Sequence, residues 1–116
     1  MRVLICGSRE WRDKEAVERV IRKFDAGTII IHGNSTYGVD RLADETYVEY
    51  RTVIRYPADW NQYGKRAGFV RNMQMLDTNP DEVHAFWNGT SKGTLHTING
   101  AKKRNIPIFI YEEYKD

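Results

Sequence analysis

Short apolar stretches alternate along this chain with longer segments in which apolar residues recur every three or four positions. Apolar runs rich in β-branched residues are typical of strands buried on both faces, whereas the longer period is typical of helices with one buried face. The alternation predicts successive βα units that feed a mainly parallel sheet. Five strands are expected, at Arg2–Cys6, Thr28–His32, Thr52–Tyr56, Glu82–Trp87 and Pro107–Tyr111.

Four helices are predicted between these strands. The clearest one follows Asp13, whose side chain suits the N-cap position, and Gly27 ends it. The others are expected at Val39–Tyr50, Ala67–Leu76 and Leu95–Lys103, and residues 57–64 are expected to form a loop. Together these patterns indicate a three-layer α/β fold. The inward-facing residues of the first two helices are expected to be Ala16, Val17, Val20, Ile21, Phe24, Val39, Leu42, Ala43, Tyr47 and Tyr50.

Length and composition are those of an ordinary globular domain. With 116 residues, 41% of them hydrophobic and 29% charged, the chain fits a single domain spanning residues 1–116. Cys6, the one cysteine, lies in an apolar strand, so we expect a buried, inert thiol and no intramolecular disulfide. No apolar stretch approaches the roughly 18 residues of a membrane span, and the N-terminus opens into a strand pattern in place of a signal peptide. A cytoplasmic protein without membrane contact is therefore expected.

The charge pattern argues against nucleic acid as the main partner. The formal net charge is only +2, without the dense basic stripe that salt-dependent DNA binding requires. The cluster Lys102-Lys103-Arg104 is locally positive. Because it lies in the last turn of a predicted helix, where cations stabilise the negative end of the dipole, a structural role is the simpler interpretation.

Three of the predicted strands run into loops of small, polar residues, and these loops are the first candidates for chemistry. Ligands of open α/β sheets bind outside the carboxyl ends of the strands, where free backbone N–H groups and helix starts attract anions. Each loop by itself can equally be a simple turn, and Asp40 can serve only the first turn of its helix. Three such loops at one edge of the sheet favour a phosphate site. The loops are Gly7–Trp11, His32–Asp40 and Asn88–Thr94.

Arg71 and Asn72 interrupt the otherwise apolar third helix. An arginine there is suited to a bidentate contact with a phosphate or carboxylate, and a surface salt bridge is the alternative. His32, His84 and His96 have neither metal-ligand spacing nor neighbouring cysteines, so no structural zinc is predicted. The motifs of common serine hydrolases, P-loop NTPases and zinc proteases are absent from the sequence.

Taken in order, several motifs resemble the YspA branch of the SLOG superfamily, which is commonly found in bacteria and phages. The resemblance spans nearly the whole chain and implies a Rossmann-like sheet that binds nucleotides or nucleotide-derived ligands, often as an oligomer. The superfamily also includes the "lonely guy" phosphoribohydrolases, the DprA/Smf proteins and the YpsA proteins. The motifs are Leu4–Trp11, His32-Gly33, Gly38–Ala43, Tyr56–Trp60, Tyr63–Lys65, Ala67-Gly68, Arg71-Asn72 and Gly93-Thr94.

The loops and the resemblance together select the candidate ligand-binding residues. In the hydrolases of the superfamily, a Gly-Gly-x-Gly-Thr-x-x-Glu motif supplies a glutamate that is needed to cleave the N-glycosidic bond. Here Thr97 stands at the glutamate position, and threonine can neither stabilise an oxocarbenium-like centre nor activate water. A carboxylate from another loop, Asp40, Glu10 or Asp59, would have to substitute. The candidate residues are Gly7, Ser8, Arg9, Glu10, Trp11, Gly33, Asn34, Gly38, Asp40, Arg71, Asn72, Gly93 and Thr94.

Three functions remain open at this point. The leading hypothesis is a module that binds or senses an ADP-ribose-like, NAD-derived or mononucleotide ligand, with Arg9 and Arg71 on phosphate and Trp11 or Trp60 against the base. The second is a nucleoside-phosphate hydrolase with a relocated carboxylate, and the third is a DprA-like, DNA-associated protein. No tightly bound cofactor is predicted, and a homo-oligomer is expected because 12% of the residues are aromatic, more than one small core readily hides.

Overall fold

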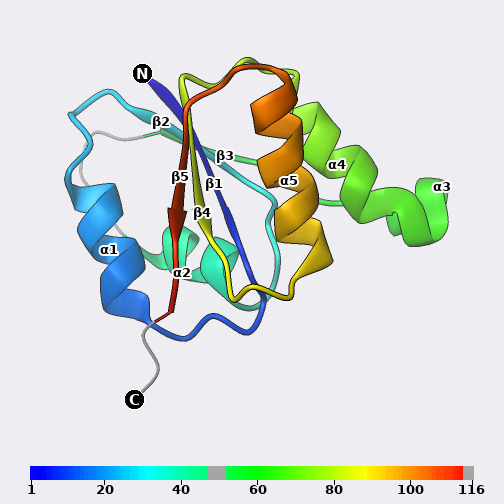
Figure 1. The fold of residues 1–116 in the computed structure, drawn as a ribbon, viewed down its shortest axis with the longest axis horizontal. Coiled ribbons are helices and arrows are strands. Elements are labelled where there is room, and N and C mark those ends of the chain that lie inside the picture. Colours follow the sequence, from blue (N-terminus) through cyan, green and yellow to red (C-terminus); the bar gives the residue numbers. More distant parts are fainter. Residues whose placement is uncertain (47–51, 114–116) are drawn as a thin grey trace.

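The central feature of the fold is a parallel sheet of five strands (Figure 1). In the computed structural model, which describes residues 1–46 and 52–113, the strands lie in the order β3-β2-β1-β4-β5, and every neighbouring pair is parallel. Each strand begins and ends within one residue of its predicted bounds. The strands are β1 (Arg2–Gly7), β2 (Ile29–His32), β3 (Thr52–Arg55), β4 (Glu82–Phe86) and β5 (Ile108–Tyr111).

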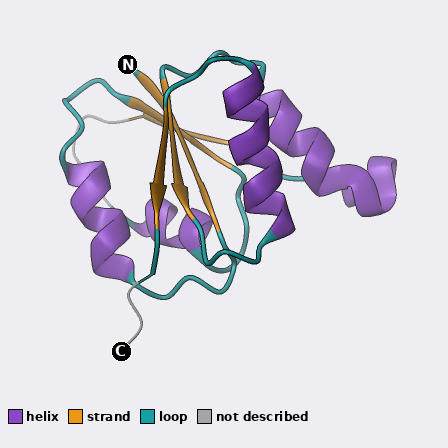
Figure 2. Ribbon diagram, viewed as in Figure 1, coloured by secondary structure: helices purple, strands orange, loops and turns teal. Residues whose placement is uncertain are grey.

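Helices cover both faces of this sheet, as Figure 2 shows. Helices α1 (Lys14–Arg22) and α2 (Val39–Glu45) pack on one face, and α4 (Ala67–Leu76) and α5 (Lys92–Lys103) pack on the other. A short helix, α3 (Trp60–Tyr63), and the 3-10 turn η1 (Gly64–Arg66) lead into α4. The predicted three-layer, Rossmann-like α/β fold is therefore confirmed.

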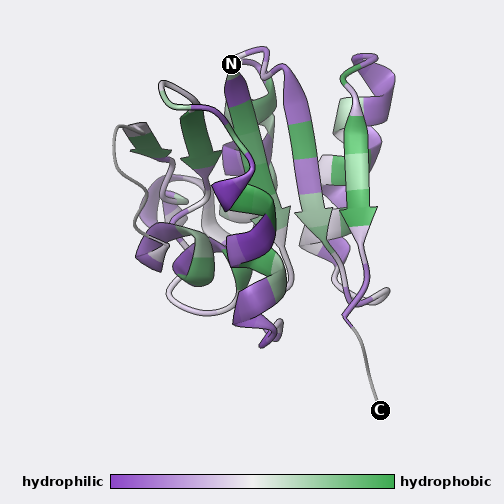
Figure 3. Cartoon of the chain, turned by 90° about the vertical axis from the view of Figure 1, so that its left-hand side faces the viewer, coloured by the Kyte–Doolittle hydropathy of each residue, from purple (hydrophilic) through white to green (hydrophobic). Residues whose placement is uncertain are grey.

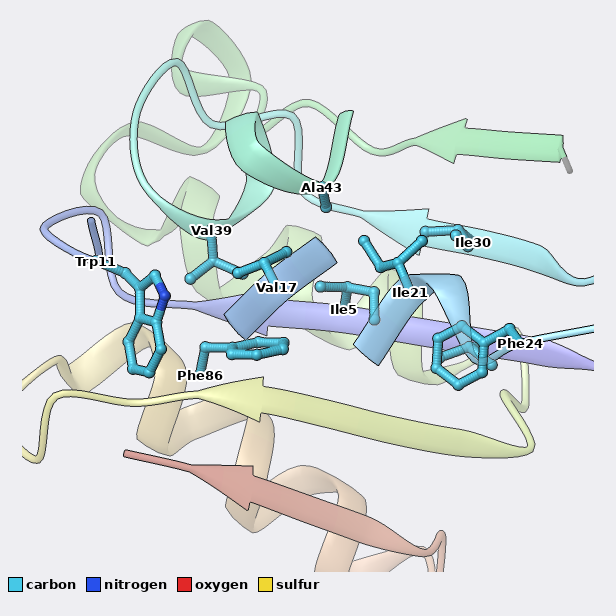
Figure 4. Packing of buried hydrophobic residues seen from close by; sticks show 10 residues of the cluster. Ile5, Trp11, Val17, Ile21, Phe24, Ile30, Val39, Ala43 and Phe86 are labelled. Carbon is cyan, nitrogen blue, oxygen red and sulfur yellow. The ribbon is translucent and has the colours of Figure 1, made fainter. Parts of the chain in front are cut away.

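The residues of β1 alternate between two hydrophobic cores because successive side chains of a strand point to opposite faces. Val3 and Ile5 pack with Val17 and Ile21 of α1 on one face (Figure 4). On the other face, Leu4 and Cys6 pack with residues that include Met75, Leu76 and Ile98 of α4 and α5. Figure 3 shows the corresponding hydrophobic interior of the sheet, while the helices carry hydrophilic residues as well. The interpretation of Cys6 as a buried thiol is confirmed, and burial raises its pKa.

Three helices and one loop differ from the sequence-based prediction: α1 ends at Arg22, short of Gly27, and capping side chains set the starts of α3 and α5. The predicted loop 57–64 contains α3, which begins where the Asp59 carboxylate accepts the N–H of Gln62 (3.0 Å). Likewise α5 begins at Lys92, before the predicted Leu95, because Ser91 caps it. Helix α2 ends at Glu45, and the predicted inward-facing Tyr47 and Tyr50 lie outside the described residues.

The strand order creates a crevice between the carboxyl ends of β1 and β4. From β1 the chain turns to α1 on one face, whereas from β4 it turns to α5 on the other face. Connections that leave adjacent strands in opposite directions open a gap at which ligands of doubly wound sheets bind. The fold therefore points to this edge of the sheet as the place to look for a site.

The basic cluster lies at the other end of α5. Lys102 and Lys103 occupy the last turn of the helix, as the dipole argument predicts. Arg104 donates to the carbonyl oxygen of Gly100 (3.1 Å) and to the Asp77 carboxylate (2.9 Å). In the described part of the chain, no helix has the length and apolar character needed to cross a membrane.

Candidate ligand-binding site

A cavity of about 460 Å³ lies at this crevice, between α4 and α5. All three polar loops reach it, together with one face of α4 on which Gly68, Arg71, Asn72 and Met75 recur at helical spacing. A second hollow of about 350 Å³ adjoins the first, because Arg9, Ser35, Trp60 and Arg71 line both. The larger cavity is also lined by Cys6, Gly7, Ser8, Glu10, Asp40, Lys65, Phe69, Asn88, Thr90, Ser91, Gly93, Thr94 and Thr97.

Ser8 joins the loops that frame the larger cavity. Its N–H donates to the carbonyl oxygen of Phe86 at the end of β4 (3.0 Å), and its carbonyl oxygen accepts the N–H of Val39 in α2 (3.3 Å). Its hydroxyl accepts the N–H of Asn88 (3.1 Å). Because Ser8 is only 1% exposed, these bonds are shielded from water and hold three segments at one point. Ser8 thus lines the cavity and also holds together the segments that form its wall.

Arg71 spans the space between α4 and the ends of β2 and β3. Its Nη1 donates to the carbonyl oxygens of Gly33 and, at 3.5 Å, Tyr56, and its Nε donates to the side-chain oxygen of Asn72 (2.9 Å). Asn72 in turn donates to the carbonyl oxygen of Gly93 (3.3 Å). Burial lowers the pKa of Arg71, and the nearby Asp40 opposes that shift. The surface salt bridge considered for Arg71 is not among the described ion pairs; the guanidinium ties two loops together while lining both hollows.

Asp40 is a carboxylate that is 8% exposed and lines the larger cavity. One of its oxygens accepts the N–H of Ser35 (3.1 Å). Burial raises the pKa of Asp40, while His32, the Ser35 N–H, Arg71 and Arg9 act in the opposite direction. The balance leaves the charged form disfavoured relative to an exposed aspartate.

The second loop is held in place by His32, a buried side chain at the end of β2. The N–H of Asn34 donates to Nδ1 of His32 (3.0 Å), which fixes the tautomer with the proton on Nε2. Nε2 then donates to the Asp44 carboxylate (3.0 Å), which also accepts Nε of Arg55. Although partial burial opposes it, these hydrogen bonds lower the pKa of Asp44. The backbone of Asn34 adopts φ of 56°, a conformation that asparagine tolerates.

The start of α5 offers backbone donors to the cavity. Ser91 caps the helix through the N–H of Thr94 (3.3 Å), and the Asn88 side chain accepts the N–H groups of Thr90 and Ser91 (both 2.9 Å). The N–H groups of the first helical turn have no acceptor within the helix. A β-carbon added at Gly93 would meet nothing within 4 Å, so the helix backbone is open to close approach there.

Most of the candidate residues from the sequence converge in space. Two of them, Gly33 and Asn34, line the smaller hollow only, and two, Trp11 and Gly38, line neither. Arg9 and Arg71 line both hollows. Those in the larger cavity are Gly7, Ser8, Arg9, Glu10, Asp40, Arg71, Asn72, Gly93 and Thr94.

Trp11 lies in the core, which corrects its assignment to the ligand. Its ring is 2% exposed and packs edge-on against Phe86, with the ring centroids 5.4 Å apart (Figure 4). The indole N–H donates to the carbonyl oxygen of Asp13 (2.9 Å), so the polar atom of the ring is satisfied there. Of the two aromatic residues considered for stacking on a base, only Trp60 lines the hollows.

Two glycines that were assigned to ligand approach are required mainly by packing. A β-carbon at Gly38, where φ is 74°, would collide with the carbonyl oxygen of Ser8 and with Arg9. A β-carbon at Gly7 would collide with Val39 and lie 2.6 Å from the carbonyl oxygen of Phe86. Gly38 therefore allows α2 to begin against the first loop. A side chain at this position would disturb the fold itself, whether or not Gly38 contacts a ligand.

Sequence reasoning missed Lys65 and Phe69 as cavity residues. Lys65 follows the aromatic loop, and Phe69 reads as part of an apolar helix. The available signal was the period of α4, because Gly68, Arg71 and Met75 share one face with helical spacing. Of the possible replacement carboxylates, Asp40 and Glu10 line the cavity, whereas Asp59 caps α3. Within residues 1–46 and 52–113, no three His, Cys, Asp or Glu side chains gather as metal ligands would.

Known proteins are similar to this chain over half or more of its length. A family model, YAcAr, described as the YspA, cpYpsA-related SLOG family, matches residues 1–63, which include the first two polar loops. The chain is also 35% identical to the "Gene 61 protein" of Mycobacterium phage D29, over an alignment that covers 92% of this chain and 93% of the phage protein. No solved structure gives a significant match.

The buried carboxylate predicts a pH-dependent stability. Because the pKa of Asp40 is raised in the folded protein, the folded state holds its proton longer, so ionisation of Asp40 lowers stability as pH rises above about 4. We expect Asp40→Asn, which can still accept the Ser35 N–H, to melt at a higher temperature than the parent at pH 7. The difference should shrink as the pH is lowered to 4, measured by calorimetry without ligand.

Asp44→Asn on the same helix is the matched control. The pKa of Asp44 is lowered, so this variant should melt below the parent at pH 7, and the deficit should also shrink toward low pH. If the parent protein were more stable than Asp40→Asn at pH 7, the prediction would be wrong. The groups around Asp40 would then more than compensate for the burial of its charge.

Proposed function

Because the chain belongs to the YspA, cpYpsA-related SLOG family, we propose that it binds or senses a nucleotide or nucleotide-derived ligand in the larger cavity. The observation that carries the proposal is the convergence of three polar loops and Arg71 on one hollow at the switch point of the sheet. Its volume of about 460 Å³ lies within the usual range of small-molecule sites. The ligand classes proposed are ADP-ribose-like compounds, NAD-derived compounds and mononucleotides.

The phosphate end of the ligand is proposed to lie between Arg9 and the start of α5. Arg9 is exposed and lines both hollows, so its guanidinium is available to an anion. The first-turn N–H groups near Gly93 lie on the same cavity and carry the positive end of the helix dipole. Lys65 adds a further cation to the lining. Arg71 contributes through the guanidinium nitrogen that its described hydrogen bonds leave free, Nη2.

The base is proposed to lie against Trp60. This ring is 52% exposed and lines both hollows, so about half of its large surface is left uncovered by the protein. Phe69, which is 45% exposed, lines the larger cavity from the adjoining helix. Stacking of a base on an aromatic side chain contributes about 1–3 kcal/mol and tolerates different bases. Trp60 thus takes the role for which Trp11 was also considered.

A second candidate function is hydrolysis of an N-glycosidic bond, favoured by one observation. Asp40 is a buried carboxylate in the cavity with a raised pKa, a combination typical of acid–base groups. In this reaction a carboxylate would take a proton from water as the water oxygen bonds to the anomeric carbon and the bond to the base breaks, and the carboxylate would then return that proton to the departing base. Thr97 lines the same cavity but donates its hydroxyl to the carbonyl oxygen of Gly93 (3.3 Å). DNA association has less support, because the basic cluster lies at the far end of α5.

Self-association is proposed through the outer face of α3, α4 and α5. Large hydrophobic side chains are exposed there, and a ring contact between Phe69 and His96 joins α4 to α5. Exposed apolar clusters of this kind mark interaction surfaces more often than isolated residues do. A second copy of the chain is the proposed partner. The exposed hydrophobic residues on these helices that line neither hollow are Tyr63, Met73 and Leu95.

The binding proposal predicts opposite effects of Gly93→Ala on stability and on affinity. The added methyl group meets open space and removes a helix-breaking glycine, so the ligand-free protein should be as stable or up to about 1 kcal/mol more stable. The same methyl group should weaken binding tenfold or more by blocking backbone approach to phosphate. Thermal shift and calorimetric titration with nucleoside monophosphates, ADP-ribose and NAD measure both effects.

Asn99→Ala, an exposed change on the same helix outside the cavity, is the control and should bind like the parent. If none of these compounds stabilised the parent protein, the proposed function would be wrong. Unchanged affinity in Gly93→Ala would instead remove the start of α5 from the phosphate site.

The two candidate functions differ in what happens to the ligand. Under the leading proposal, each bound nucleotide should be recovered intact after prolonged incubation with the protein, as followed by chromatography. Release of free base that disappears in Asp40→Asn would establish the hydrolase. Release that persists in this variant would come from another group or from a contaminant.

The proposed self-association predicts an oligomer in solution that surface charges disrupt. We expect a dimer or tetramer by light scattering at high micromolar concentration. The double variant Met73→Glu, Leu95→Glu should dissociate it, since neither residue lines the cavity and each would bury a charge in the interface. A parent protein that is monomeric at that concentration would refute this proposal.

A further inference from the structure

The carboxylate of Asp40 retains an oxygen without a described protein partner. Its Oδ2 accepts the N–H of Ser35, and no donor to Oδ1 is found in the described part of the chain. In the described part of the chain, two fully buried side-chain atoms have no hydrogen-bond partner, Nε of Arg2 and Nδ1 of His96. Oδ1 of Asp40 is not among these fully buried atoms. The residue is 92% buried and lines the larger cavity, so we place the free acceptor capacity of this carboxylate at that cavity.

The charge of Asp40 is also unpaired. None of the ion pairs among the described residues includes it, although Arg71 lies nearby. Arg71 directs its Nη1 to the carbonyl oxygens of Gly33 and Tyr56 and its Nε to Asn72 instead. A buried carboxylate with a free oxygen is stabilised by any hydrogen-bond donor that a ligand brings.

The chemistry of that donor follows from the charges around the cavity. A phosphate beside Asp40 would meet a like charge, so phosphate belongs near Arg9 and the start of α5. A neutral hydroxyl beside Asp40 gains a charge-assisted hydrogen bond. In nucleotides, the sugar carries such hydroxyls, and acidic side chains are common partners of ribose hydroxyls in dinucleotide sites.

We infer that Asp40 accepts the 2′- or 3′-hydroxyl of a ribose, so that the site selects ribonucleotides over their 2′- or 3′-deoxy counterparts. This inference rests on the proposed nucleotide-binding function and names the part of the ligand that lies beside Asp40. It assigns Asp40 to specificity, while other lining residues supply the contacts to phosphate and base.

The test compares ligands that differ by one hydroxyl. Calorimetric titration would use AMP, GMP, CMP and UMP, each with its 2′-deoxy form, and 3′-deoxy-AMP to separate the two positions. We expect the parent protein to bind at least one ribonucleotide roughly 10- to 150-fold more tightly than the matching deoxy compound, the loss that removal of a hydrogen bond to a charged group produces.

Asp40→Asn should reduce this selectivity, because the charge-assisted hydrogen bond from the hydroxyl is lost. Its carbonyl oxygen can keep the bond to the Ser35 N–H, which turns the amide group toward the cavity in place of an acceptor. Affinity for the ribonucleotide should therefore fall toward that for the deoxy compound, whose own affinity should change little. Glu45→Gln, an exposed change on the same helix and outside the cavity, should keep the selectivity of the parent.

The outcomes separate the inference from the function on which it rests. If no nucleotide bound to the parent protein, the proposed function would fail as well. If ribo and deoxy compounds bound equally, or if Asp40→Asn kept the full selectivity, the inference would be wrong while nucleotide binding stood. The comparison of ligands on the parent protein needs no variant and decides the question of ribose selectivity even if Asp40→Asn does not fold.

Discussion

The structure depends on the hydrogen bonds that Ser8 makes at the carboxyl end of the central strand. They join the end of β4, the loop that follows it and the first turn of α2, in a place that water does not reach. Side chains at Gly7 or Gly38 would collide with this junction, so both positions need glycine for packing. The junction also opens the crevice, because the chain leaves β1 and β4 toward opposite faces of the sheet. Fold and cavity thus share one set of backbone contacts.

Asp40, which is buried, and Arg71, which is partly buried, form no direct ion pair inside this frame. Arg71 neutralises backbone dipoles at the ends of two strands, and Asp40 holds a backbone N–H of the second loop. Burial moves the pKa of both side chains toward the neutral form, and each partly offsets the shift of the other across a short distance. A salt bridge would use part of the donor capacity of Arg71 and part of the acceptor capacity of Asp40. The observed arrangement leaves Nη2 of Arg71 and Oδ1 of Asp40 without a described protein partner, on two residues that line the cavity.

The fold could be predicted from the sequence because its signals are local. Each strand is an apolar run between turn residues, and the polar loops at the strand ends could be placed at one edge of the sheet from connectivity alone. Trp11 was misplaced because the direction of a side chain after a strand depends on the core into which it packs, here Phe86. The helix at Trp60–Tyr63 is too short to show a period, and its start depends on the Asp59 cap. The period of α4 shows which of its residues share a face, but the packing of α4 and η1 on the sheet decides that Phe69 and Lys65 reach the cavity.

The lining around Thr97 bears on the proposed use of the cavity. Thr97 lines the cavity and donates its hydroxyl to the carbonyl oxygen of Gly93, at the position where the motif resemblance implies the glutamate of the hydrolases. Two carboxylates enclosed together would repel each other and raise one pKa strongly. With threonine at position 97, Asp40 is the one buried carboxylate among the described lining residues, since Glu10 is exposed. Among the described lining residues the cavity thus holds one buried carboxylate together with the cations Arg9, Lys65 and Arg71, and the proposed recognition of a nucleotide rests on this charge pattern.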